Sequence, residues 1–249
     1  GVCVTQRNQP SLATVGTALD GDDVILSTSS SGSVTLSVDD ASAVTVLPLV
    51  GKRPVNGVDG GHEAAAWISD FLGGIYRFAA VTDDSKHRAP SSIDSFEQNI
   101  TFVDLAPVLL ANSASVRWLQ ERALQPFGME RFRPNVIVDA GEPWIEDSWR
   151  DLTIGAANLT AEVPWPRCAV PQIDQESGER QREPAVVLRA HRWCSEAPTL
   201  EGNWKTMTEG NALFGMGCRV APAGSTIKVG DLVEVQTFQD PILAPPLDI

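Results

Sequence analysis

The sequence predicts a mainly β protein with peripheral helices, which places it in the α+β class. Short runs of β-branched and other apolar residues recur along the chain, bounded by Gly, Asp and Ser. Segments with helical spacing are few and do not alternate with the strand segments, which argues against a doubly wound parallel sheet. The 249 residues, 43% of them hydrophobic, suffice for one large β-rich domain or two smaller ones.

The first fifty residues contain three strand candidates. Leu12–Val15, Val24–Ser27 and Val34–Val38 are rich in β-branched and apolar side chains. The segments Gly21–Asp23 and Thr28–Gly32 are rich in residues that favour turns, so they bound the second strand on either side. These strands predict a β domain at the start of the chain.

A helix and a domain boundary are predicted next. Apolar side chains recur at helical spacing within Gly61–Leu72, and Gly73-Gly74 provides the stop. Tyr76–Val81 is a strand candidate. The Asp- and Ser-rich segment Thr82–Ser95 is the best linker in the chain, so we divide the sequence into domains at 1–84 and 85–249.

The second domain is predicted to hold three strand regions and two helices. Val108–Leu110 precedes the first helix. The helices cover Ser113 to about Leu124 and Glu183–Arg192. Strands are predicted at Val136–Val138, which is wholly apolar and therefore buried, at Leu159–Gln172 as one strand or a pair, and at Thr226–Gln236.

Charge and composition exclude several functional classes. The formal net charge of −13 argues against nucleic acid as a partner, because phosphates would be repelled. No apolar run approaches the ~20 residues needed to cross a bilayer, and no secretory signal pattern opens the chain. The four cysteines form no CxxC pair, which favours a reducing, intracellular compartment over a disulfide scaffold.

Arg167-Cys168 is the most informative dipeptide in the chain. A thiolate is a ligand for soft metals, and a neighbouring guanidinium lowers a thiol pKa and binds phosphate oxygens. A second arginine cluster lies upstream at Arg131 and Arg133. A buried cysteine beside a surface arginine is the commoner arrangement, so this pair alone leaves both readings open. Cys3, Cys194 and Cys218 are most simply small buried apolar residues.

Ordered blocks around Arg167-Cys168 carry a family resemblance. They are Arg131-Phe132-Arg133-Pro134-Asn135-Val136, Glu146-Asp147-Ser148-Trp149, Leu152-Thr153-Ile154-Gly155, Arg167-Cys168, Asp174 with Gly178, Glu183-Pro184 with Leu188 and Arg192, Leu213-Phe214-Gly215, and Thr226-Ile227-Lys228-Val229-Gly230-Asp231. In this order the chain resembles the MOSC family, named for the C-terminal domain of molybdenum cofactor sulfurase. It looks most like the branch containing the mitochondrial amidoxime-reducing component.

The resemblance implies a fold and an activity. It implies a MOSC-type β-barrel preceded by a partial N-terminal β-barrel domain. Members of this branch bind a molybdenum–molybdopterin cofactor and reduce N-hydroxylated compounds. They take electrons from a cytochrome b5-type or flavin/iron–sulfur partner. Mitochondrial location is favoured on this basis, with the cytoplasm as the alternative.

The resemblance also assigns roles to residues. Cys168 would ligate molybdenum, and Cys168 and Asp147 would be the catalytic residues, with Asp147 as an acceptor near the pocket. Arg133, Arg167 and Asn135 would hold the cofactor. The alternative for Asp147 is an ordinary turn or N-cap carboxylate.

Several positions depart from the family pattern. Leu105-Ala106-Pro107 stands where hydroxyl residues commonly precede the proline, Pro166 where serine often precedes Arg-Cys, and Gly217 where an aromatic residue is common. Each change would remove a hydrogen-bond donor from the cofactor site that the resemblance implies. Two alternatives follow: a MOSC-fold structural or accessory subunit that has lost the cofactor, and a sulfur carrier that uses Cys168 as a persulfide.

The beginning of the chain resembles a point already inside the family's N-terminal barrel. The expected earlier strands, with their phosphate-contacting residues, have no counterpart before Gly1-Val2-Cys3-Val4. An open strand edge is normally paired or covered. We therefore expect a neighbouring chain, or a further segment, against this edge.

Overall fold

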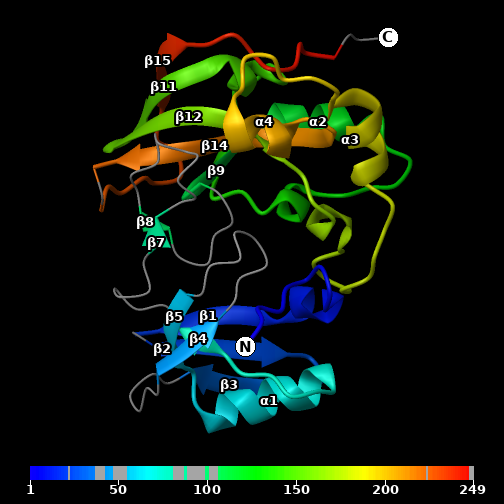
Figure 1. The fold of residues 1–249 in the computed structure, drawn as a ribbon, viewed down its shortest axis with the longest axis vertical. Helices are drawn as coiled ribbons and strands as arrows, with labels where there is room; N and C mark the ends of the chain where they lie inside the picture. The colour runs from blue at the N-terminus through cyan, green and yellow to red at the C-terminus, as the bar shows by residue number, and fades with distance from the viewer. Residues whose placement is uncertain are drawn as a thin grey trace. The chain divides into compact units, whose positions relative to one another are not determined.

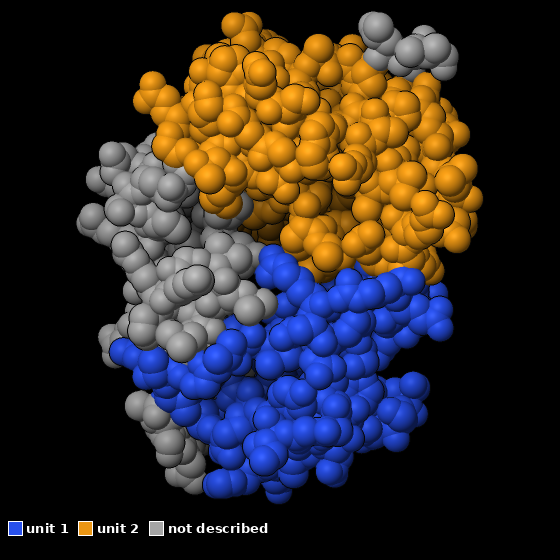
Figure 2. Space-filling view, turned by 45° about the vertical axis from the view of Figure 1, so that its right-hand side comes forward, with its two compact units in different colours: residues 1–87, 99–104, 173–180 blue, residues 88–98, 105–172, 181–249 orange. Residues whose placement is uncertain are grey.

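The computed structural model describes residues 1–21, 23–36, 43–46, 55–80, 87–88, 99–100, 106–222 and 224–246. Two compact units divide the chain (Figure 2). Unit 1 takes in Gly1–His87, Asn99–Asp104 and Ile173–Arg180. Unit 2 takes in Arg88–Gln98, Leu105–Gln172 and Gln181–Ile249. Most of the predicted linker Thr82–Ser95 lies outside the described residues, so the boundary at 84/85 stays a prediction.

Unit 1 is built from short antiparallel strands and one helix. Its elements are η1 (Pro10–Thr14), β1 (Gly16–Asp20), β2 (Asp23–Thr28), β3 (Gly32–Leu36), β4 (Ala43–Val46), β5 (Val55–Asp59), α1 (His62–Leu72) and β6 (Ala79–Ala80). The first sheet has the order β1-β2-β3 and the second β4-β5-β6. Two further short strands are β7 (His87–Arg88) and β8 (Asn99–Ile100).

The helix predicted in this unit is confirmed. Ala64, Ala65 and Ile68 of α1 are buried, as the helical spacing requires. Gly73 ends the helix with φ +68°, and its N–H donates to Ser69 O at 2.9 Å.

Two strand predictions in unit 1 need correction. The prediction Val24–Ser27 is confirmed as β2, and Val34–Leu36 of the third prediction lies in β3, while Ser37 and Val38 lie outside the described residues. The segment predicted as Leu12–Val15 is the 3₁₀ helix η1, which begins at Pro10, and β1 starts only at Gly16. Proline fixes φ near its helical value, so it favours a turn of helix here. Within Tyr76–Val81, only Ala79–Ala80 pairs as a strand, and Val81 lies outside the described residues.

Unit 2 holds the larger sheet and three of the four α-helices found in the described chain. Its elements are β9 (Val108–Asn112), α2 (Ser113–Gln120), η3 (Met129–Phe132), β10 (Val136–Val138), η4 (Ile145–Ser148), β11 (Trp149–Ile154), β12 (Ala157–Pro166), η5 (Val170–Gln172), α3 (Ala185–His191), β13 (Trp193–Cys194), α4 (Gly202–Thr208), β14 (Asn211–Ala221) and β15 (Val233–Phe238).

The sheet of unit 2 has the order β10-β9-β14-β12-β11-β15, with β13 also paired to β14. Every pairing is antiparallel except that of β9 with β10. Figure 1 shows the strands curling, with α2, α3 and α4 near one another beside them. This arrangement confirms the α+β class. No helix in the described ranges is long and apolar enough to cross a membrane.

Two apolar clusters use opposite sides of this sheet. Leu110 joins the cluster inside the curl, and its neighbour Ala111 joins the cluster beneath α2 and α3. On β14, Phe214 and Met216 also divide between the two clusters, although residues two apart on a regular strand share a face. Gly215 between them has φ +76°, and a Cβ there would lie 2.8 Å from Leu110 O. This glycine allows the strand to change face.

Three predictions in unit 2 are corrected at their ends, and one in its burial. The first helix stops at Gln120, because Leu124 is 80% exposed and has no core to join. The strand predicted at Leu159–Gln172 ends at Pro166. The strand predicted at Thr226–Gln236 begins only at Val233, after a turn at Val229-Gly230 in which Gly230 has φ +96°. Val136–Val138 has the predicted bounds, but Ile137 is 58% exposed, so that strand is not wholly buried. The helix within Glu183–Arg192 is confirmed as α3.

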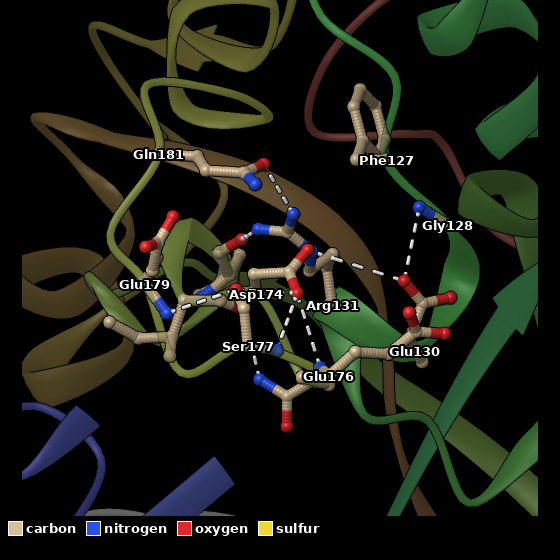
Figure 3. A network of polar contacts seen from close by, with 12 residues as sticks. Phe127, Gly128, Glu130, Arg131, Asp174, Glu176, Ser177, Glu179 and Gln181 are labelled. Carbon is tan, nitrogen blue, oxygen red and sulfur yellow. Dashed lines mark hydrogen bonds and ion pairs between the residues drawn. The ribbon is translucent and has the colours of Figure 1, made fainter. Parts of the chain in front are cut away.

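Two residues of the family pattern, Asp174 and Gly178, have structural roles in the loop 173–180. The Asp174 carboxylate accepts hydrogen bonds from the backbone N–H and hydroxyl of Ser177, both at 2.9 Å (Figure 3). Gly178 has φ +72°, and a Cβ there would lie 3.2 Å from Ser11 Cα. Asp174 and Gly178 therefore shape this loop and its packing on η1 within unit 1.

Asn112 joins β9, α2 and the loop before η4. Its Oδ1 accepts from Ala114 N at 3.0 Å and Ala140 N at 3.3 Å. Its Nδ2 donates to Glu142 O at 2.8 Å and Glu146 Oε2 at 2.9 Å. The side chain is fully buried, so all its hydrogen-bonding capacity is used inside the protein.

We predict that Asn112→Ala lowers the free energy of unfolding by about 3–5 kcal/mol, because two buried groups, Ala114 N and Glu146 Oε2, and two partly buried ones lose a partner at once. Asn158→Ala is the matched control. Asn158 is exposed and only accepts from Thr153 Oγ1, so its loss should cost under ~0.5 kcal/mol. Urea unfolding measures both, and equal losses would contradict the role given to Asn112.

Candidate functional site

Cys168 lies directly after the end of β12 and before η5. The backbone N–H of Arg167 donates to Ala212 O at 2.8 Å, which holds the dipeptide against β14. Pro166 has no N–H, so the ladder cannot continue as a regular strand at this point. The thiol-bearing residue is exposed, while Cys194 and Cys218 are buried. The dipeptide therefore lies at a strand end, and not within a strand as the sequence suggested.

The guanidinium of Arg167 is the principal unsatisfied group beside Cys168. Its Nη2 donates to Phe132 O at 2.8 Å. Its Nε and Nη1 are buried and have no hydrogen-bond partner among the described residues. Burial lowers the pKa of Arg167 to about 10; the Cys168 thiolate opposes this shift, and the charge of Arg133 adds to it. Two buried N–H donors without acceptors indicate a place for an anionic or carbonyl-bearing group.

Arg133 approaches this group from η3. It caps η3 in the left-handed conformation, with φ 55°, and its side chain is exposed. A non-glycine residue in this region carries backbone strain on the order of 1 kcal/mol, which the structure tolerates mostly at functional positions. Arg133 thus adds a second positive charge near the Arg167 guanidinium.

The third predicted cofactor residue, Asn135, has a structural role in these contacts. Its Oδ1 accepts from Leu109 N at 2.8 Å, and its own N–H donates to Leu109 O at 2.9 Å. This pair of hydrogen bonds fixes the start of β10 beside β9. Its role towards a cofactor stays a prediction.

The first arginine of the upstream cluster is also structural. Arg131 is 1% exposed, and its guanidinium donates to Gln181 Oε1 at 2.5 Å and Pro171 O at 3.3 Å. Figure 3 shows it between Gln181 and Glu130. Arg131 ties η3 to the chain around η5, whereas Arg133, two residues later, is exposed.

Asp147 is buried in a pair with Arg192. The Arg192 Nη2 donates to Asp147 Oδ2, and the guanidinium carbon lies 4.2 Å from the centroid of the Trp144 ring. Burial raises the pKa of Asp147, and the charge of Arg192 opposes this shift. Asp147 lies within the 3₁₀ turn η4, and its carboxylate binds Arg192 and caps no helix in the described chain. Its catalytic role stays a prediction.

An aromatic stack connects the two arginines. The rings of Phe132 and Phe214 lie 3.9 Å apart between centroids, and Trp144 packs edge-on against Phe214 at 6.2 Å. The Arg167 guanidinium lies 5.5 Å from the Phe132 ring, and Arg192 lies over Trp144. Sequence reasoning placed Arg192 and Phe214 in the family pattern but gave them no role.

Glu146 is a further residue to which the sequence gave no role. It is fully buried and accepts from Ser115 Oγ at 2.6 Å and Asn112 Nδ2 at 2.9 Å. Burial raises its pKa from 4.5 to about 7; the adjacent Asp147 carboxylate adds to the shift, and the hydrogen bonds from Ser115 and Asn112 oppose it. Its position next to Asp147 was visible in the sequence, but its burial was not.

One departure from the family pattern has a packing explanation. A Cβ on Gly217 would lie 2.7 Å from the ring of Trp165 and 3.3 Å from the Cβ of Ala106. The Trp165 ring therefore covers the place where a side chain at position 217 would begin. Ala106 is buried, and Leu105 lies outside the described residues.

Comparison with known proteins identifies the family. The model of the MOSC domain matches residues 97–234, and that of the MOSC N-terminal β-barrel domain matches residues 1–74. The chain belongs to the MOSC family. The blocks around Arg133, Asp147 and Cys168 all lie within the matched MOSC domain.

Relatives of known name agree with this assignment. "Mitochondrial amidoxime reducing component 2" of Rattus norvegicus is 29% identical over 242 residues, which cover 94% of this chain and 69% of the relative. "Mitochondrial amidoxime-reducing component 1" of Homo sapiens is 29% identical over 239 residues, with the same coverage. "Molybdenum cofactor sulfurase" of Drosophila pseudoobscura pseudoobscura is 32% identical over 193 residues, 76% of this chain and 24% of the relative. MOSC relatives are thus associated with the molybdenum cofactor.

We predict that Glu146 contributes a pH-dependent term to stability. A carboxyl whose folded pKa is raised binds its proton more tightly in the folded state. Its contribution is therefore present below pH 4.5 and lost as the pH rises through about 7. The shift corresponds to roughly 3 kcal/mol. Glu146→Gln, which carries no titrating group, should gain stability relative to the parent between pH 5 and 8.

Urea unfolding of both proteins across this pH range provides the measurement. Glu142→Gln serves as the control, because Glu142 is exposed. A constant difference between Glu146→Gln and the parent at every pH would show that Glu146 does not titrate in this range.

Proposed function

We propose that this MOSC protein is a molybdenum-cofactor-binding oxidoreductase that reduces N-hydroxylated compounds. The observation that carries the proposal is the pair of buried, unpartnered N–H donors on Arg167 beside the exposed Cys168. The names of the amidoxime-reducing relatives support the substrate class.

The donor set fits a metal that arrives within a larger anionic cofactor. Among the described residues, no three His, Cys, Asp or Glu side chains gather as a metal site. A single thiolate needs further ligands from outside the protein to hold a metal. A phosphorylated, dithiolene-bearing pterin would provide these ligands together with acceptors for the free Arg167 donors.

The residues then divide the work. Cys168 would ligate molybdenum, Arg167 would donate to cofactor oxygens, and Arg133 would neutralise negative charge at the exposed side. When bound, the cofactor supplies two-electron redox chemistry. Asp147 and Arg192 would support the site from beneath the aromatic stack and would not contact the reacting atoms.

The reaction requires an electron donor. Reduction of an N-hydroxylated substrate consumes two electrons and two protons and releases water, so each turnover needs an external reductant. We propose a cytochrome b5-type or flavin/iron–sulfur partner in this role. The names of the relatives also support a mitochondrial location.

Similarity to a molybdenum cofactor sulfurase supports a second candidate function, a sulfur carrier. An exposed thiol beside a guanidinium could carry sulfur as a persulfide, because the neighbouring cation stabilises the thiolate. Cyanolysis of the intact protein would release this sulfur. Molybdenum in the same preparation, without releasable sulfur, favours the reductase.

We predict that Cys168→Ala removes molybdenum from the purified protein and leaves the fold unchanged, because Cys168 is exposed and supplies the ligand. Elemental analysis gives the metal content, and circular dichroism checks the fold. Cys3→Ala is the control and should keep the metal. Equal molybdenum in the parent and Cys168→Ala would exclude ligation by Cys168.

We also predict that Arg133→Lys loses cofactor about tenfold faster than the parent, since lysine keeps the charge but lacks the planar fork. Arg117→Lys is the matched control: Arg117 is an exposed arginine that pairs with Asp139 at 3.1 Å. Pterin fluorescence after gel filtration reports retention. If Arg133→Lys and Arg117→Lys both retain the cofactor like the parent, Arg133 does not bind it.

A further inference from the structure

A cavity of about 870 Å³ lies where the two ends of the curled sheet of unit 2 face each other. Strands β10 and β15 are these ends, and they do not pair with each other in the described chain. Both strands pack side chains against the cluster inside the curl: Val136 and Val138 from β10, and Val233 and Val235 from β15. The curled sheet is therefore open along one side, and the cavity lies in this opening.

The cavity is separate from the Cys168 site. Neither Cys168, Arg167 nor Arg133 belongs to its described wall. Trp149 and Ile154 of the wall are part of the cluster inside the curl. The aromatic stack beside Arg167 belongs instead to the cluster beneath α2 and α3, on the opposite side of the sheet. The sheet thus lies between the two sites.

Apolar side chains that water still reaches gather at this cavity. Ten large apolar side chains are exposed in the part of the chain that the structure describes, and five of them line this wall: Ile137, Ile227, Val229, Leu232 and Phe238. Single exposed apolar residues are ordinary, whereas a gathering of this kind marks a binding surface. An apolar occupant would remove these side chains from water, which is favourable.

The charges in the described wall are balanced. Lys228 and Asp231 have opposite charges and lie in one turn, where the Asp231 carboxylate accepts from Lys228 N at 2.8 Å. Asp139 is paired with Arg117 at 3.1 Å. The Oδ1 of Asn135 already accepts from the backbone of β9. An ion of either sign would lose its water here without gaining a counter-charge that is not already opposed or paired.

The form of the cavity suits an extended ligand. Its wall follows β15 from Val233 to Phe238, a path of about 16 Å at the usual rise of a strand. Its volume lies in the upper part of the range that small-molecule sites occupy. A slender apolar chain would lie along this strand and cover the exposed side chains.

We propose that this cavity binds an uncharged lipid-like molecule, an extended apolar chain that ends in a neutral head such as a hydroxyl group. The chain would pack along β15 against the cluster inside the curl, and the head would stay in contact with water at the opening. Burial of apolar surface supplies the binding energy, and the balanced charges of the wall select a neutral head. The inference does not rest on the proposed function.

Calorimetric titration of the full chain with 1-decanol tests the proposal, with decanoate and decylammonium as charged ligands of the same chain length. Decanol should bind saturably and with a negative heat-capacity change, because apolar surface is buried. Each ion should bind about tenfold more weakly, because its head must lose water without an unopposed partner. The absence of saturable decanol binding overturns the proposal, and so does an ion that binds as tightly as decanol.

Two variants locate the site. Leu232→Asp places a charge in the wall and Phe238→Ser removes a ring from it, so each should weaken decanol binding about tenfold. Leu124→Asp is the matched control and should bind like the parent, because Leu124 is 80% exposed, against 79% for Leu232, and lies outside the described wall. Decanol binding that is the same in Leu232→Asp and the parent would exclude this cavity as the site.

Sedimentation velocity tests whether a second copy of the chain occupies the opening instead. The proposal expects the parent and Leu232→Asp to sediment alike. A parent dimer that dissociates in Leu232→Asp would assign the exposed side chains to self-association and overturn the proposal. Thermal unfolding of each variant verifies that it is folded.

Discussion

The stacking of Phe132 on Phe214 is the contact on which the Cys168 site depends. It joins η3 to β14, the strand that also pairs with β9, β12 and β13. The carbonyl of Phe132 then accepts from Arg167 Nη2 at 2.8 Å, and Arg133 follows Phe132 directly. The ring contact therefore holds the segment that binds the Arg167 guanidinium and carries Arg133.

Burial of charge is the second constraint on this part of the molecule. Glu146, Asp147 and Arg192 are each at most 5% exposed. Removing one member of such a buried pair usually costs more than the pair contributes, because the remaining charge keeps its desolvation cost. The Asp147–Arg192 pair is therefore weak evidence for a gain in stability. It is better evidence that η4, α3 and β14 must keep one relative arrangement. Both carboxylate oxygens of Glu146 accept hydrogen bonds, whereas Asp147 Oδ1 and Arg192 Nε and Nη1 have no partner among the described residues.

The departures from the family pattern read differently once packing is known. Gly217 looked like the loss of an aromatic contact, yet the ring of Trp165 covers that place. Pro166 looked like the loss of a hydroxyl, and it coincides with the end of β12, where Arg167 leaves the sheet. Gly217 thus packs against the Trp165 ring, and Pro166 marks the point where the chain leaves β12.

Local patterns in the sequence determined the elements that depend on their own residues. Helix α1 was predictable from the helical spacing of its apolar residues and from the glycines that end it. Strands β2 and β3 were predictable from short apolar and β-branched runs bounded by turn residues. Ordered blocks were enough to place the chain in the MOSC family. Tertiary structure decided the rest: Arg131 and Arg133 are two residues apart, yet one is buried and the other exposed. Asp147 finds its partner 45 residues away. The role of a charged side chain is set by burial and by partners distant in sequence, and no local pattern contains either.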